Sequence, residues 1–523
     1  MARAVRLALY ALRVATLLAE GSERVVRASL DLLELDGAQH FPVPDGITHI
    51  VVEIGCNGHG LLWNTPFGKD IRGIRKGVGL SQEPHVLLVS FEPLLDKYAT
   101  YLSIQNRGSS GRDAITSASQ TSPPIGWSVP GRAVVLPYAV GSSEDYADFH
   151  VAKTDGCSSM LPINNSMKKW SGDGSRFMSG VCGSEAATRR VPVISLRTIL
   201  GWFPNHKIAF VKIDAQGYDL HVALSAGDAI SRIEWLELEI TGNKWHLPYV
   251  GAEKCSDVMA QLAAVGFIGS RNRALDNRLC NATFHGSMTF RQNASIIDIT
   301  PQQDSTIVGG QPRVRQTGTA SMLRATLDLL DLSEGLIRVP DGITRIVVEI
   351  GTGADGGFLW NTPFPHSLPG IERGTPISQQ KHVLLVSFEP RLDRYAAYLT
   401  LNKKIVESYN LPGLARSRVE VPTALGWSYP GRAIVLPFAV GGAIKCAKRA
   451  LDTRYPHISL RSVLNWFPSR AVDYIHVASR ATLGCQGHEI AQSAGDAISQ
   501  VGAMGLEAGR LIHSRFDDPG AWS

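Results

Sequence analysis

The chain repeats itself, and this repeat constrains its fold more than any other feature. Residues 44–55 (PDGITHIVVEIG) recur nearly 300 residues later as residues 340–351 (PDGITRIVVEIG). Further matches follow in the same order: HVLLVSFEP from His85 and His382, GRAVVLPYAVG and GRAIVLPFAVG from Gly131 and Gly431, and ISLRTILGWFP and ISLRSVLNWFP from Ile194 and Ile458. The period is far too long for a solenoid, so the sequence predicts a tandem duplication of a whole domain.

A length of 523 residues exceeds one hydrophobic core, which agrees with two domains. We expect an N-terminal helical or targeting segment at 1–40, a first domain at 41–300, a polar linker at 301–319 and a second, shortened copy at 320–523. The net charge of +5 comes from 52 basic and 47 acidic residues. This excess is too small to indicate a nucleic-acid partner, which needs a concentrated basic patch.

The compartment stays open between the cytoplasm and an organelle. The first nineteen residues contain three arginines and no acid, which is typical of a transit peptide and equally of a plain amphipathic helix. Arg13 interrupts this apolar stretch, which is too short for a transmembrane segment. Seven cysteines without a CxxC pair or a zinc pattern favour a reduced interior and no metal site. The oligomeric state is not indicated.

Apolar runs alternate with helical patterns through the first copy. Strands are expected at 47–54, 86–91, 133–140, 208–213 and 235–240, with helices at 94–102 and 218–229. The connections 68–84 and 108–130 read as long loops, and Pro66 ends any helix after the first strand early. This order predicts an α/β fold, with a mostly parallel sheet, helices on both faces and a ligand at the carboxyl ends of the strands.

The first strand ends in a glycine-rich turn. Glu53 stands two residues before Gly55, and Asn57, Gly58 and Gly60 follow. Glycines at a strand-to-helix turn let the backbone approach a ligand closely. The spacing differs from the GxGxxG of dinucleotide sites, and a carboxylate ahead of the glycines suits a ligand that carries an ammonium group.

The second strand ends at Glu92, followed by Pro93. A carboxylate at this tip is placed to accept hydrogen bonds from both hydroxyls of a ribose. A solvent-facing glutamate that begins the next helix would show the same two residues. Glu53 and the glycines one strand earlier favour the ligand-binding interpretation.

Lys212 and Asp214 lie on one face of the fourth strand and its end, because side chains alternate along a strand. They stand where a substrate hydroxyl would be presented, although a structural salt bridge is the alternative. Cys56 is expected to be a packed residue. Glu237 and Glu239 alternate with apolar residues, as on an exposed strand face.

The order EIGCNGHG, SFEP, AVG, GCSSM, VISL and KIDAQGYD resembles the FkbM-type methyltransferases over about residues 45–241. The resemblance implies a class I, Rossmann-like methyltransferase fold and S-adenosylmethionine as cofactor. It implies O-methylation of a hydroxyl on a small molecule or a carbohydrate. Cofactor-binding positions would be Glu53, Gly55, Asn57, Gly58, Gly60, Glu92 and Gly141, with Lys212 and Asp214 as the catalytic pair beside the acceptor.

Two features depart from the family pattern. Gln216 stands where the family has a glutamate. The second copy is shorter: Ile458 lies 17 residues after Gly441, whereas Ile194 lies 53 residues after Gly141 in the first copy. The second copy also lacks the lysine and the aspartate of the KID motif. We therefore expect the second copy to be inactive.

Two alternatives stay open. One is a nicotinamide- or flavin-dependent oxidoreductase, since GxGxxG occurs at 351–356. The other is a non-catalytic binding protein that keeps the methyltransferase fold.

Overall fold

The computed structural model describes residues 25–56, 61–102, 126–153, 155–164, 185–269, 278, 280–281, 285–293, 321–351, 359–400, 405–407, 418–420, 425–440, 455–467, 471–478, 487–506 and 510–512. The chain divides into unit 2, with residues Ser29–Leu327 and Leu392–Thr423, and unit 1, with Met1–Ala28, Asp328–Arg391 and Ala424–Ser523. The predicted glycine-turn positions Asn57, Gly58 and Gly60 lie outside the described residues, as do the arginines of the first nineteen residues.

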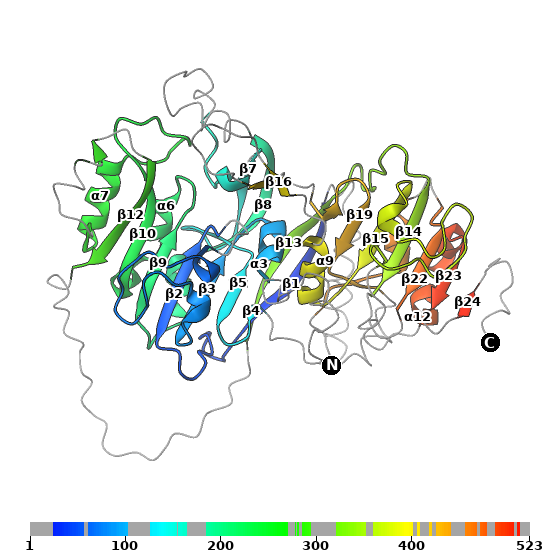
Figure 1. The fold of residues 1–523 in the computed structure, drawn as a ribbon, viewed down its shortest axis with the longest axis horizontal. Helices are drawn as coiled ribbons and strands as arrows, with labels where there is room; N and C mark the ends of the chain where they lie inside the picture. Colours follow the sequence, from blue (N-terminus) through cyan, green and yellow to red (C-terminus); the bar gives the residue numbers. More distant parts are fainter. Residues whose placement is uncertain are drawn as a thin grey trace, which may run out of the picture. The chain divides into compact units, whose positions relative to one another are not determined.

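Unit 2 is built on an eight-stranded sheet with the order β11-β12-β10-β9-β2-β3-β5-β4 (Figure 1). Its strands are β2 (His49–Ile54), β3 (Val86–Phe91), β4 (Trp127–Val129), β5 (Ala133–Leu136), β9 (Ile208–Ile213), β10 (Ile233–Thr241), β11 (Phe267–Gly269) and β12 (His285–Gln292). The central strands from β5 to β10 run parallel, whereas β4, β11 and β12 pair antiparallel at the two sides. The expected mostly parallel sheet is therefore present, with antiparallel strands added at both edges.

The central strands are buried on both sides, which explains their unbroken apolar sequences. Part of the expected loop 68–84 also belongs to the core. Phe67, Ile71, Ile74 and Leu80 pack with Val51 of β2 in one cluster of buried side chains. Long connections of this kind read as loops because their apolar residues follow neither strand nor helix periodicity.

The expected strand at 133–140 is two strands. Pro137 has no N–H to donate to a sheet, and the chain leaves the main sheet there. After it, β6 (Ala139–Val140) joins β7 (Tyr146–Ala152) and β8 (Glu185–Ile194) in a separate sheet of order β6-β8-β7. This small sheet begins at the carboxyl ends of β5 and β3, where Glu92 donates its backbone N–H to Leu136.

Helices in the described part of unit 2 are few and short. They are α2 (Leu61–Asn64), α3 (Leu95–Leu102), α5 (Leu196–Gly201), α6 (Asp219–Leu224), α7 (Cys255–Ala264) and α9 (Leu392–Thr400). As predicted, α2 ends shortly before Pro66. The helix expected at 218–229 is shorter, because α6 gives way to a 3₁₀ turn at Gly227–Arg232.

The sheet of unit 1 has the order β18-β19-β15-β14-β22-β23-β24. Its strands are β14 (Arg345–Ile350), β15 (Val383–Phe388), β18 (Trp427–Tyr429), β19 (Ala433–Leu436), β22 (Tyr474–Val477), β23 (Met504–Leu506) and β24 (Arg510–Ile512). The strands whose sequences match occupy matching places in the two sheets. A short parallel pair, β20 (Ala439–Val440) with β21 (His457–Ile458), stands where unit 2 has the β6-β8-β7 sheet.

Two expectations need correction. Val25–Leu35, inside the segment 1–40 that was expected to be helical, forms strand β1, because buried Val26 and Ala28 alternate with exposed Arg27 and Ser29. The expected absence of disulfides is wrong as well. Cys255 and Cys280 form a disulfide that ties the start of α7 to the segment before β12, and Cys157 is also disulfide-bonded. Irregular cysteine spacing does not report which residues meet in the fold.

Candidate active site

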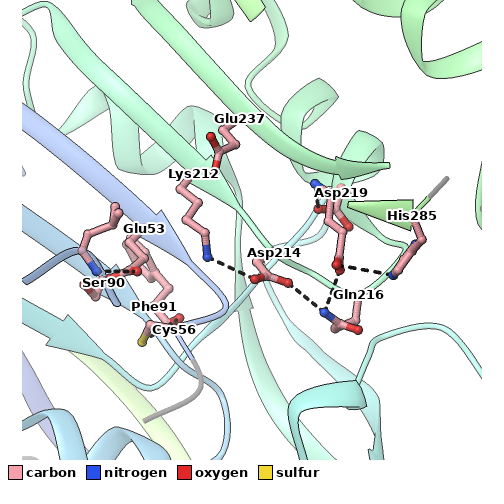
Figure 2. Close-up of polar contacts among 12 residues, drawn as sticks. Glu53, Cys56, Ser90, Phe91, Lys212, Asp214, Gln216, Asp219, Glu237 and His285 are labelled. Atoms are coloured by element: carbon pink, nitrogen blue, oxygen red, sulfur yellow. Dashed lines mark hydrogen bonds and ion pairs between the residues drawn. The ribbon is translucent and has the colours of Figure 1, made fainter. Parts of the chain in front are cut away.

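The carboxyl ends of β2, β3 and β9 meet at one edge of the sheet in unit 2, and most of the predicted residues lie there (Figure 2). An open cleft begins at this edge. Its walls come from the ends of β2 and β3, from the small sheet and from the turn after β9. The lining residues are Ile54, Gly55, Glu92, Pro93, Leu94, Tyr138, Ala139, Val140, Phe149, Gly156, Ser158, Met160, Asp214, Ala215, Gln216 and Tyr218.

Gly55 lets two strand ends approach each other. Its φ is +77°, and a Cβ atom there would lie 1.9 Å from the backbone oxygen of Asp214. The N–H of Asp214 donates to the carbonyl of Ile54 at 2.9 Å, and the N–H of Gly55 donates to the carbonyl of Phe91 at 3.1 Å. Only glycine fits this position without a backbone shift.

Glu53 is fully buried behind the cleft and does not line it. Its carboxylate accepts the N–H of Leu62 and the hydroxyl of Ser90, each at 3.3 Å. Burial raises the pKa of Glu53 to about 7, although the nearby ammonium of Lys212 opposes this increase. Glu53 therefore ties the start of α2 to the sheet, and its contact with the ligand would be indirect.

Glu92 stands at the tip of β3 and lines the cleft, as predicted. Only 4% of the residue is exposed. One carboxylate oxygen accepts the backbone N–H of Leu94 at 3.0 Å, which fixes the side chain beside the cleft. The alternative of a solvent-facing glutamate is wrong, because Glu92 is buried.

Lys212 and Asp214 form an ion pair, with 3.0 Å between Nζ and Oδ2. In the sheet Lys212 lies beside Glu53 on one side and Glu237 on the other. Burial lowers the pKa of Lys212, but the carboxylates of Asp214 and Glu53 raise it more, so its net pKa lies above the ordinary value. Asp214 reaches the cleft, with 27% of its side chain exposed, and Lys212 holds it from behind.

Gln216 links two carboxylates beside the cleft. Its Nε2 donates to Asp214 and to Glu239, each at 2.8 Å, and its Oε1 lies 2.8 Å from the hydroxyl of Tyr249. The backbone of Gln216 has a φ of +52°, which is uncommon for a residue with a side chain. Because each amide group has a polar partner, the side chain has one well-defined orientation.

Buried acids surround this glutamine. Asp219 accepts the N–H groups of Gly217 and Glu239, each at 3.0 Å, and burial together with the charge of Asp214 raises its pKa to about 8. Burial also raises the pKa of Glu239 well above its usual range. His285 Nε2 lies 3.4 Å from Glu239, at the far end of the row in Figure 2.

Sequence reasoning missed this group of residues. Glu237 and Glu239 were expected on an exposed face, but Glu237 is buried and Glu239 contacts Gln216. The antiparallel strand β12 pairs with β10 along its outer edge and places His285 opposite Thr241. In β12 the apolar Met288 and Phe290 alternate with polar residues, and this short strand signal was not used in predicting the sheet.

Gly141 lies beside the cleft and does not line it. A Cβ atom there would lie 3.2 Å from the ring of Tyr218 and 3.3 Å from Val193. Gly141 thus gives room to Tyr218, which does line the cleft. The GCSSM segment contributes Gly156, Ser158 and Met160 to the opposite wall.

Cys56 is a buried free thiol. Burial raises its pKa well above the ordinary value, and the charges of Glu92 and Glu53 raise it further. A thiol with a raised pKa forms little of the nucleophilic thiolate, so Cys56 is a packed residue, as predicted.

Within the part of the chain that the structure describes, no group of three or more His, Cys, Asp or Glu side chains is arranged to hold a metal ion. No helix among these same residues combines the length and the apolar character needed to cross a membrane.

Comparison with known families assigns the region that contains the cleft. Residues 81–268 match the model of the methyltransferase FkbM domain. No curated protein and no solved structure matched the chain. The matched segment includes Glu92, Lys212, Asp214 and Gln216, and β2 with Glu53 precedes it. The class I methyltransferase fold that this domain implies agrees with a parallel-centred sheet whose strand ends form the cleft. The match over residues 81–268 therefore identifies a methyltransferase domain of the FkbM type within the chain.

Proposed function

We propose that unit 2 transfers the methyl group of S-adenosylmethionine to a hydroxyl of a small molecule or a carbohydrate. One observation carries this proposal: Glu92 and the pair Lys212–Asp214 line or border one open cleft at the ends of neighbouring parallel strands. Ligands of open α/β sheets bind at this edge.

The residues of the cleft suit the proposed cofactor. Glu92 has one oxygen held by the N–H of Leu94, and its carboxylate faces the cleft, where it would accept the hydroxyls of a ribose. Gly55 keeps the backbone open at the same edge. Apolar side chains such as Val140, Phe149 and Met160 supply the wall that an uncharged ring system needs.

The cofactor supplies an electrophilic methyl group, and the protein supplies the orientation and the proton acceptor. Asp214 lies on the cleft wall, where its carboxylate would accept the proton of the acceptor hydroxyl and orient the oxygen. Lys212 and the amide of Gln216 hold this carboxylate from two sides. Neither Lys212, with its raised pKa, nor Gln216 is suited to take up the proton.

Unit 1 does not transfer methyl groups in this proposal. In the strand registers, His476 takes the place of Lys212, since it pairs with Glu349 as Lys212 pairs with Glu53. Ala478 follows where Asp214 follows in unit 2. A sheet without a carboxylate at this strand end cannot remove the hydroxyl proton in the same way.

The test is binding and turnover with the full chain. We expect labelled S-adenosylmethionine to bind and its methyl group to pass to one or more members of a panel of sugars and phenols. NADH and flavins serve as controls for the oxidoreductase alternative. Binding without transfer to any member, together with unchanged binding in a Glu92→Ala variant, would contradict the proposed site.

A further inference from the structure

Unit 1 keeps the strand end that holds Glu92 in unit 2. Glu389 follows β15 as Glu92 follows β3, and 1% of it is exposed. One oxygen of Glu389 accepts the N–H of Arg391 at 3.1 Å, matching the bond from Leu94 to Glu92 at 3.0 Å. The backbone N–H of Glu389 donates to Leu436 at 2.9 Å, as that of Glu92 donates to Leu136 at 3.0 Å.

The neighbouring strand end is kept as well. Gly351 has a φ of +70°, close to the +77° of Gly55. Its N–H donates to Phe388 at 2.9 Å, and the N–H of Ala478 donates to Ile350 at 3.0 Å. The ends of β14, β15 and β22 are therefore joined in unit 1 by the same backbone hydrogen bonds as the ends of β2, β3 and β9.

The charges around this edge are different. Glu349 accepts the N–H of Leu359 at 2.9 Å and the hydroxyl of Ser387 at 2.7 Å, as Glu53 does with its own partners. No lysine lies beside it in β22, where His476 occupies the place of Lys212. Burial raises the pKa of Glu349 to about 8, so this side chain is mostly protonated and uncharged at neutral pH.

We propose that the carboxyl edge of the unit 1 sheet is a second binding site, in which Glu389 holds the two ribose hydroxyls of an uncharged ribonucleoside. The proposal rests on the ribose-binding role proposed for Glu92, because the two carboxylates have the same backbone partners. It goes further in assigning a ligand to the unit that lacks the catalytic pair.

The class of ligand follows from the groups that unit 1 lacks. A ligand with a cationic amino-acid arm needs carboxylates nearby. Among the described residues of this edge, Ala478 takes the place of Asp214, and the mostly protonated Glu349 takes the place of Glu53. A ribose needs only the carboxylate at the end of the second strand. An uncharged nucleoside therefore fits the retained half of the site, and S-adenosylmethionine fits it poorly.

Calorimetry with the full chain tests this proposal, with adenosine, 2′-deoxyadenosine and S-adenosylhomocysteine as probes. The variant Glu92→Gln weakens the unit 2 site and exposes the binding of unit 1. In this background we expect adenosine to bind still, and 2′-deoxyadenosine to bind at least about tenfold more weakly because one hydroxyl is missing. This comparison of ligands needs no change in unit 1.

Adding Glu389→Gln should weaken the remaining adenosine binding at least about tenfold. Glu372→Gln, at an exposed carboxylate of unit 1, is the matched control and should leave it unchanged. Adenosine binding that ignores Glu389, makes no distinction from the 2′-deoxy form or vanishes with Glu92→Gln alone would overturn the second site. S-adenosylhomocysteine reports on unit 2 separately: if it fails to bind the wild type while Glu389-dependent adenosine binding persists, only the function proposed for unit 2 fails.

Discussion

The two sheets share a framework and differ at one strand end. In both, a buried glutamate lies near the end of the first central strand, and a glycine with positive φ follows that strand. A second glutamate follows the next strand, and the backbone hydrogen bonds between the strand ends are the same. The sheet of unit 2 adds Lys212 and Asp214 on the next strand, whereas that of unit 1 has His476 and Ala478. The arrangement of the strands therefore does not depend on the charged groups at their ends, because the sheet of unit 1 forms without the ion pair.

The strands beyond that position differ as well. β10 has nine residues and β23 has three, and β10 is paired along seven positions with β12, while β23 is paired along three with β24. Gly502 precedes β23 and Gly505 lies within it, and glycine weakens a strand, which agrees with the short length of β23. The longer β10–β12 pair is what carries Glu239 and His285 to the cleft side of unit 2.

The largest expected effect tests whether the Lys212–Asp214 pair makes unit 2 active and its absence makes unit 1 inactive. Asp214→Asn keeps the shape of the side chain but removes the charge that would take the hydroxyl proton. We expect methyl transfer by the full chain to fall by about 10²–10⁴-fold. Affinity for S-adenosylhomocysteine should change little. Normal turnover on an identified acceptor would show that Asp214 is not the base or that unit 1 also catalyses the reaction.

The shared backbone geometry is tested by Gly55→Ala. The new Cβ atom would meet the oxygen of Asp214, and φ is +77°. Left-handed strain and overpacking together should cost about 2–4 kcal/mol of unfolding free energy. Gly46→Ala is the matched control, since its φ is +84° and no atom lies within 4 Å of its Cβ position. Chemical denaturation measures both variants, and equal costs would mean that the close approach of the two strand ends is not important.

Glu92→Ala tests the glutamate that follows the second central strand in both units. Each charge-assisted hydrogen bond contributes about 1.5–3 kcal/mol, so affinity for S-adenosylmethionine should drop at least about tenfold. Asp228→Ala, at an exposed carboxylate of unit 2, is the control for a lost negative charge. Calorimetry that finds the same affinity for Glu92→Ala and wild type would remove Glu92 from the site.

The smallest effect concerns the two buried glutamates. Their folded pKa values, about 7 for Glu53 and about 8 for Glu349, lie above those of an unfolded chain. The folded state therefore binds the extra protons, and stability from these groups is present below about pH 4.5 and is lost as the pH rises through the folded pKa. Between pH 7 and pH 8 the stability from Glu349 is still being lost, and this loss amounts to about 1 kcal/mol. The stability from Glu53 is nearly all lost by pH 7, so its further change in this interval is smaller.

Denaturation of the Glu349→Gln and Glu53→Gln variants at pH 7 and pH 8 measures this difference. We expect the first substitution to remove the part of the pH dependence that Glu349 contributes in this interval, about 1 kcal/mol, and the second to change the pH dependence little. The contribution of Asp219, whose pKa is also about 8, stays in both variants. Equal slopes in the two variants would show that Lys212 does not distinguish the environments of the two glutamates.

The sequence allowed much of this framework to be predicted. Each central strand was identified from its buried apolar run, and the positions of Glu92, Lys212 and Asp214 at strand ends were identified from where those runs stop. The repeated segments predicted a duplicated domain, and the strands with matching sequences take matching places in the two sheets.

Other features depend on contacts between distant residues and could not be read locally. Gln216 joins Asp214 and Glu239 by hydrogen bonds. This arrangement depends on the pairing of β12 with β10 and on the positive φ of Gln216. Pro137 signals a break in the strand at 133–140, but not that the chain then enters a second sheet. The disulfide between Cys255 and Cys280 joins residues 25 positions apart, and their spacing has no recognisable pattern.

Binding of labelled S-adenosylmethionine to the full chain, with NADH as competitor, distinguishes a methyltransferase cofactor site from a dinucleotide site at this strand edge. We expect saturable binding that S-adenosylhomocysteine displaces and that excess NADH leaves unchanged. Glu92→Ala should weaken this binding at least about tenfold. Displacement by NADH, or binding that is insensitive to Glu92, would contradict the assignment of this strand edge in unit 2 to S-adenosylmethionine.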